Sequence, residues 1–133
     1  MLLLNVQMKL VISDGFIQEF MDTVPAAVDY WANVSVKERY PERDGWCAIK
    51  VAYIREQEAS QDGPKVRMDF AEAHVMQGIE RILTLNADGK SMVNHAHYNS
   101  ILKAVQEDDM SNMDVFDVDC VVQAAMFNEI VYG

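Results

Sequence analysis

Aromatic and basic side chains that could hold an anionic ligand gather between residues 30 and 67. Aromatic rings can stack on a nucleobase, and Arg or Lys can neutralise a phosphate. The side chains expected to bind a small nucleotide-like ligand are Tyr30, Trp31, Lys50, Arg55 and Arg67. The alternative is structural: Trp31 and Tyr53 would belong to the core, and the cations would pair with glutamates across a hairpin.

A second group with possible chemistry is the acidic stretch 107–119, which contains no Lys or Arg. Such a stretch could cover the basic surface of a partner protein. The residues expected to do so are Asp108, Asp109, Asp114, Asp117 and Asp119. The alternative is that Asp114 and Asp117 cap the following helix, whose N-terminal end favours negative charge. The stretch lacks the glycine and the closing glutamate of a calcium loop.

Catalytic and metal-binding patterns are absent from the sequence. His95 and His97 are two positions apart, so they would not share a helix face, and no zinc spacing of Cys and His occurs. There is no nucleophile elbow, phosphate-binding loop or dinucleotide fingerprint. We therefore expect a non-enzymatic protein without metal or cofactor.

Length and net charge limit the number of domains and the kinds of partner that the protein can bind. The 133 residues fit a single domain over 1–133, and the formal net charge is −10. This charge argues against direct binding of nucleic acid or of an anionic membrane. The two cysteines, Cys47 and Cys120, are expected to be reduced core residues. The first apolar run is too short for a signal peptide or a membrane span, so a cytoplasmic location is expected.

The first half of the chain predicts a small sheet and one helix. Alternating apolar residues predict a strand over 6–12, and Ser13 is a suitable cap for a helix over 14–24. Pro25 is expected to open a second, short helical turn. Further strands are predicted over 33–40 and 46–56.

The second strand of a hairpin and a run of helices complete the prediction. A polar turn over 59–64 would lead to a strand over 65–68. Asp69, followed by Glu72, predicts the start of a helix. Two more helices are expected over 91–105 and from Asp117, with the apolar residues 130–133 docked on the core. The predicted fold is α+β: a small antiparallel sheet with a central hairpin, packed against about four helices.

Three segments resemble a family of small acidic phage and prophage proteins. They are Val11-Ile12-Ser13-Asp14, Tyr30-Trp31-Ala32 and the closing segment from Val121 to Gly133. Where the family often has Phe-Gly-Glu, this chain has Phe127-Asn128-Glu129, so a turn glycine is missing. The resemblance implies no activity and no site residue; it implies an accessory protein that acts inside an infected bacterium.

Three functional hypotheses follow from these residues and from that resemblance. The first is a counter-defence or host-takeover protein that sequesters a small nucleotide-like ligand, as a homo-oligomer, in the cytoplasm of the bacterial host. The alternative is an acidic inhibitor that binds the basic surface of a host or defence protein. A third possibility is a virion or assembly component.

Overall fold

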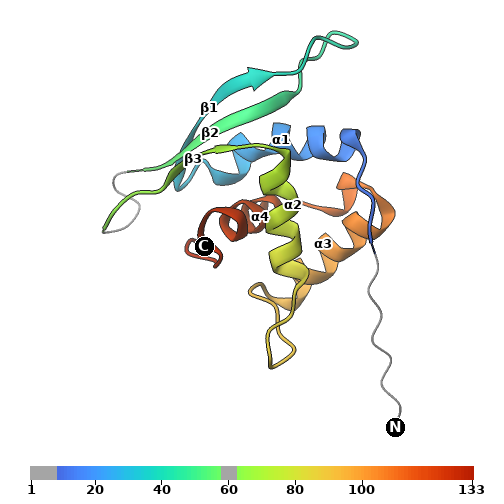
Figure 1. The fold of residues 1–133 in the computed structure, drawn as a ribbon, viewed down its shortest axis with the longest axis vertical. Coiled ribbons are helices and arrows are strands. Elements are labelled where there is room, and N and C mark those ends of the chain that lie inside the picture. The colour runs from blue at the N-terminus through green and yellow to red at the C-terminus, as the bar shows by residue number, and fades with distance from the viewer. Residues whose placement is uncertain (1–8, 58–62) are drawn as a thin grey trace.

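The computed structural model of the chain describes residues 9–57 and 63–133 (Figure 1). The helices are α1 (Asp14–Val28), α2 (Glu72–Leu83), α3 (His95–Glu107), the short 3₁₀ helix η1 (Met110–Asn112) and α4 (Val115–Phe127). The strands are β1 (Ala32–Arg39), β2 (Ile49–Glu56) and β3 (Arg67–Phe70). The predicted α+β class, with a small antiparallel sheet and four α-helices, is confirmed.

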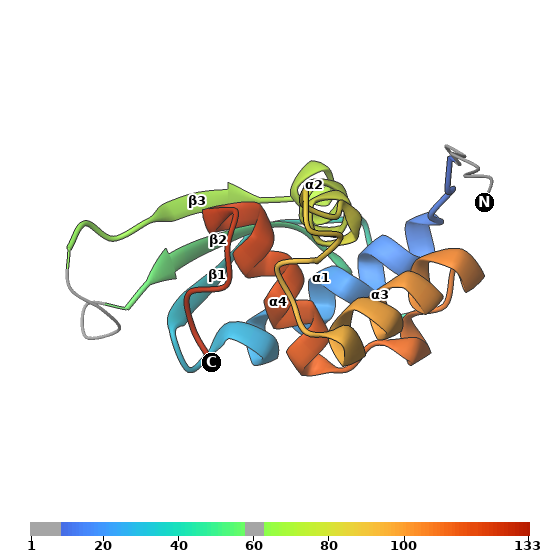
Figure 2. The ribbon, with the colours of Figure 1, turned by 90° about the horizontal axis from the view of Figure 1, so that it is seen from below.

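The sheet has the order β1-β2-β3, and both pairings are antiparallel. Because side chains alternate along a strand, one face carries the apolar row Val34, Ile54 and Met68. The helices lie on one side of the sheet (Figures 1 and 2). The other face, here called the outer sheet face, carries the row Asn33, Arg55 and Arg67.

Helix α1 begins where the sequence predicts. The Oγ of Ser13 accepts a hydrogen bond from the backbone N–H of Phe16 at 3.2 Å, which caps the first turn. The helix does not stop before Pro25, however, and continues to Val28. Proline removes one backbone hydrogen bond, but the burial of Ala27 and Val28 offsets this loss.

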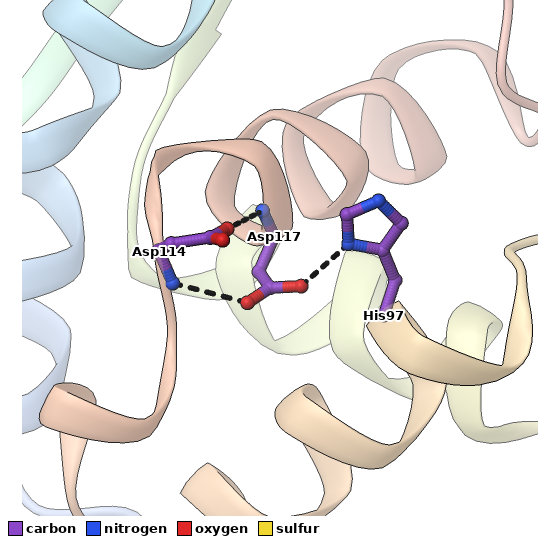
Figure 3. A group of neighbouring side chains, drawn as sticks. All are labelled: His97, Asp114 and Asp117. Atoms are coloured by element: carbon purple, nitrogen blue, oxygen red, sulfur yellow. Dashed lines mark hydrogen bonds and ion pairs between the residues drawn. The ribbon is translucent and has the colours of Figure 1, made fainter.

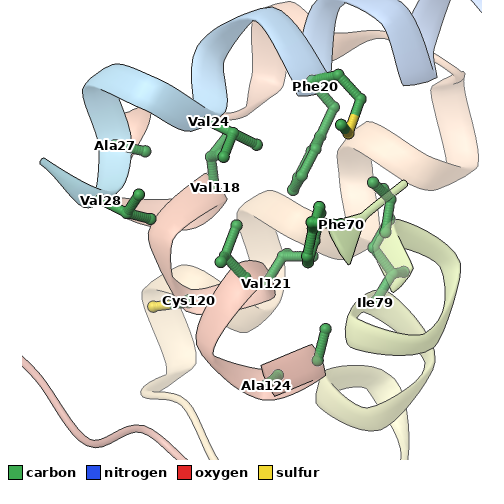
Figure 4. Packing of buried hydrophobic residues seen from close by; sticks show 14 of the residues in the cluster. Phe20, Val24, Ala27, Val28, Phe70, Ile79, Val118, Cys120, Val121 and Ala124 are labelled. Atoms are coloured by element: carbon green, nitrogen blue, oxygen red, sulfur yellow. The ribbon is translucent and has the colours of Figure 1, made fainter. Parts of the chain in front are cut away.

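Helix α4 is the centre of the core. Residues 117–125 are all buried, so this helix is covered on every side rather than along one stripe. Figure 4 shows side chains from α1, α2, β3 and α4 meeting around Val121. A Cβ built on Gly78 of α2 would lie 2.3 Å from the carbonyl oxygen of Val121, so α2 and α4 are in backbone contact.

Some predicted boundaries are wrong. Residues 9–12 form no strand, and the rest of the strand predicted over 6–12 lies outside the described residues, as do residues 59–62 of the predicted turn. Asp69 does not cap α2, because it belongs to β3 and pairs with Lys37 at 2.7 Å; the cap is Ala71.

No helix within the described residues is both long and apolar enough to cross a membrane.

Candidate functional site

The structure corrects the ligand-stacking role expected for Trp31. Its side chain is 1% exposed, and its indole N–H donates to Oδ1 of Asp119 at 2.8 Å. The ring stacks on Tyr132, with 5.0 Å between centroids and an interplanar angle of 11°. Trp31 is therefore a core residue, which was the structural alternative.

The other four predicted ligand residues are only partly brought together. Tyr30 is half exposed, and its hydroxyl donates to Oδ2 of Asp119 at 2.5 Å, on the helix side of the sheet. Lys50 pairs with Glu38 at 3.4 Å. It lies five residues from Arg55 in an extended strand, which is about 16 Å. Only Arg55 and Arg67 are neighbours, directly opposite each other in β2 and β3.

Most acidic residues of the stretch cap helices or are buried in the core. Asp114 and Asp117 form a reciprocal capping box at the start of α4, so the capping alternative is confirmed. Asp117 and Asp119 are 3% and 6% exposed, so the structure corrects the expectation that they meet a partner directly.

The remaining members of that stretch stay on the surface. Asp108 accepts hydrogen bonds from the backbone N–H and the Oγ of Ser13, at 3.0 and 3.1 Å. Asp109 caps η1 through the backbone N–H of Ser111. Asp108, Asp109 and Asp114 are exposed and remain available to a partner.

A pocket of about 460 Å³ lies between the start of α3, the first turns of α4 and the end of the chain. We call it the α3–α4 pocket. Its aromatic lining residues are Tyr30, Phe116 and Tyr132. Its polar lining includes His97, Asp119 and Cys120, and no Lys or Arg of the described residues lines it. A hollow of about 550 Å³ beside the end of α2 is lined mainly by polar side chains, and its Arg81 already caps α4 through the carbonyl oxygens of Ala124 and Ala125.

Gln123 builds one wall of the α3–α4 pocket by fixing the end of the chain. Its side chain is fully buried, and Oε1 accepts from the backbone N–H groups of Val131 and Tyr132, both at 2.8 Å. Nε2 donates to Oδ1 of Asp119 at 2.9 Å. The hydroxyl of Tyr132 donates to Glu56. The predicted docking of residues 130–133 is confirmed, and it completes the pocket.

His97 joins the pocket to the capping box of α4 (Figure 3). Its Nδ1 lies 2.7 Å from Oδ1 of Asp117, whose Oδ2 accepts from the backbone N–H of Asp114 at 3.0 Å. One ligand atom from each of these three residues lies within 4.8 Å of the others, as in a metal site. These atoms are engaged in hydrogen bonds, and a cation here would replace the proton shared by His97 and Asp117. The His95–His97 spacing gave no signal for this cluster, because its partners come from a different helix.

The electrostatic environment of the α3–α4 pocket is negative. Burial raises the pKa of the Cys120 thiol to about 12, and the charges of Asp119, Asp117 and Asp114 act in the same direction. Burial, followed by the hydrogen bond to Asp119 and its charge, raises the pKa of Tyr30. Burial disfavours a charge of either sign, but the negative charges of the nearby aspartates also favour a bound cation.

The raised pKa of the Cys120 thiol limits its reactivity. The thiolate is the reactive form of cysteine, and a thiol with a raised pKa stays protonated at neutral pH. Cys120 and His97 both line the pocket, but a protonated thiol is not an activated nucleophile.

Comparisons of this chain with protein-family models, with curated proteins and with solved structures return no match.

Proposed function

We propose that this chain is a non-catalytic binding protein whose α3–α4 pocket takes a basic, partly apolar segment of a partner protein. The observation that carries the proposal is the lining of the pocket: aromatic rings, the buried carboxylate of Asp119 and, among the described residues, no Lys or Arg. An Arg or Lys side chain fits such a lining, because its aliphatic stem can pack on the rings while its charge interacts with the carboxylate of Asp119.

Two exposed apolar residues favour a protein partner over a free amine. Phe116 is 66% exposed and Val115 is 42% exposed, and both stand at the start of α4 where Phe116 lines the pocket. Exposed aromatic residues beside a pocket are typical anchors of protein interfaces. The exposed carboxylate of Asp114 is adjacent to them in sequence and adds charge complementarity to a basic partner.

The setting of this activity is part of the same proposal. The resemblance to small acidic phage proteins supports an accessory protein that inhibits a host or defence protein in the bacterial cytoplasm. Sequestration of a nucleotide-like ligand by the five residues expected from the sequence receives less support, since Trp31 is buried and Lys50 is paired elsewhere.

A matched pair of peptides tests the proposal. One is a short amphipathic peptide of arginine and leucine, and the other carries the neutral isostere citrulline at each arginine position. Calorimetry with the full chain should detect binding of the arginine peptide only. Phe116→Ala should weaken this binding at least about tenfold, because burying a phenylalanine side chain contributes about 1.5–3 kcal/mol.

Val11→Ala is the control, because Val11 is 85% exposed and does not line the pocket. It should leave the affinity unchanged. Equal binding of the citrulline peptide, or equal losses in the two variants, would overturn the proposal.

A further inference from the structure

The outer sheet face brings two arginines together. The register places Arg55 of β2 directly opposite Arg67 of β3, and Asn33 of β1 opposite Arg55. The next row on the same face is Ser35, Tyr53 and Asp69. Both arginines are exposed, and Tyr53 is half-buried. Cationic, amide, hydroxyl and aromatic groups therefore share one small area.

The arginine pair is unfavourable without a partner. Like charges directly opposite each other on a sheet are destabilising. Among the described residues, neither arginine side chain makes a hydrogen bond or an ion pair, whereas the side chain of Arg39 donates to the carbonyl oxygen of Cys47 at 2.7 Å. The one carboxylate in the adjacent row, Asp69, is already paired with Lys37 at 2.7 Å. The positive charge of the pair is therefore available to an external anion.

We propose that Arg55 and Arg67 form an anion site that binds a small phosphate ester carrying a planar ring, such as a nucleoside monophosphate. Two guanidinium groups can hold the oxygens of one phosphate in bidentate geometry, which would remove the repulsion between them. The amide of Asn33 lies beside Arg55 in the same row and can donate a further hydrogen bond.

The ring of Tyr53 is positioned to stack on the planar ring of the ligand. It lies two residues before Arg55 on the same face, which is about 7 Å along the strand. The sugar of a nucleoside bridges a span of this size, so a base could lie on the tyrosine ring while the phosphate meets the arginines. A small ligand is favoured over a nucleic acid, because the net charge of −10 repels a polyanion.

This inference is independent of the α3–α4 pocket, and its test separates the two. Calorimetry at low salt should show that the full chain binds a nucleoside monophosphate more tightly than inorganic phosphate, with no binding of the uncharged nucleoside. Arg55→Gln and Arg67→Gln should each weaken nucleotide binding at least about tenfold. Phe116→Ala should have no effect on it.

Arg43→Gln is the matched control, because Arg43 is an exposed cation in the turn between β1 and β2 and lies in neither row. It should bind the nucleotide like the unaltered chain. A second measurement guards against misfolding: nucleotide should raise the thermal midpoint of the unaltered chain and of Arg43→Gln, but not of Arg55→Gln. Absence of nucleotide binding, equal losses in all three arginine variants, or phosphate binding as tight as nucleotide binding would overturn the proposal.

Discussion

Gly78→Ala tests whether α2 and α4 are in backbone contact, as the structure shows. A Cβ at this position would lie 2.3 Å from the carbonyl oxygen of Val121, whereas ordinary contacts begin near 3.4 Å. The two helices would therefore have to separate by about 1 Å. A backbone oxygen in a buried helix cannot rotate away as a side chain can, so the strain belongs at the upper end of the range for overpacked cores, about 3 kcal/mol.

Gly78→Ala also has a favourable effect on helix propensity. The free energy of unfolding reflects the difference between this gain and the steric strain. Alanine is better than glycine in a helix by about 1 kcal/mol. The expected net result is a loss of about 2 kcal/mol in the free energy of unfolding. Urea denaturation followed by far-UV circular dichroism measures this difference.

Gly15→Ala in α1 is the matched control. Its added Cβ would meet only Ser13 Oγ, at 3.8 Å, so the gain in helix propensity should act alone and stabilise the chain by up to about 1 kcal/mol. If Gly78→Ala were as stable as Gly15→Ala, the close approach of α2 and α4 would be refuted.

Three further predictions concern the buried groups around the pocket. Cys120 should resist alkylation in the folded chain at mildly alkaline pH while the half-buried Cys47 reacts, because burial raises the pKa of the Cys120 thiol to about 12. Mass spectrometry with and without urea measures the labelling of each cysteine. Equal labelling of both cysteines in the folded chain would contradict the prediction. Trp31→Phe should lower the free energy of unfolding by about 1–3 kcal/mol, since buried Asp119 loses a donor; an unchanged denaturation midpoint would contradict it. Burial raises the pKa of Asp117 above 3.8, so the folded state holds more protons than the unfolded state above that pH, and stability should fall as pH rises from 3.8 to the raised value. Asp117→Asn should remove this fall, and an unaltered pH profile of the denaturation midpoint would contradict the assignment.

Local signals in the sequence were sufficient for most of the fold. The Ser13 cap and the apolar face of α1 each depend on neighbours within a few residues. The pairing of β2 with β3 joins residues 12 to 18 positions apart, but alternating apolar residues mark both strands. The errors arose where tertiary contacts override local preference. Asp69 has the spacing of a helix cap but is held in β3 by its pairing with Lys37.

The site could not be derived in the same way, because it is assembled from distant segments. Trp31 and Asp119 are 88 residues apart, and a tryptophan near several cations gives no local sign that a helix will cover it. His97 and Asp117 come from different helices, so their spacing carries no pattern. The acidic residues were recognised as a group, but their division into buried and exposed members depends on how α4 enters the core.

The central claim is that the α3–α4 pocket binds a basic, partly apolar segment, and an NMR titration tests it most directly. The arginine–leucine peptide is added to the labelled full chain, and backbone amide shifts are followed. Changes confined to Asn94, His97, Phe116, Cys120 and residues 130–133 are the predicted result. Changes centred on the outer sheet face, or spread evenly over the exposed carboxylates, would contradict it.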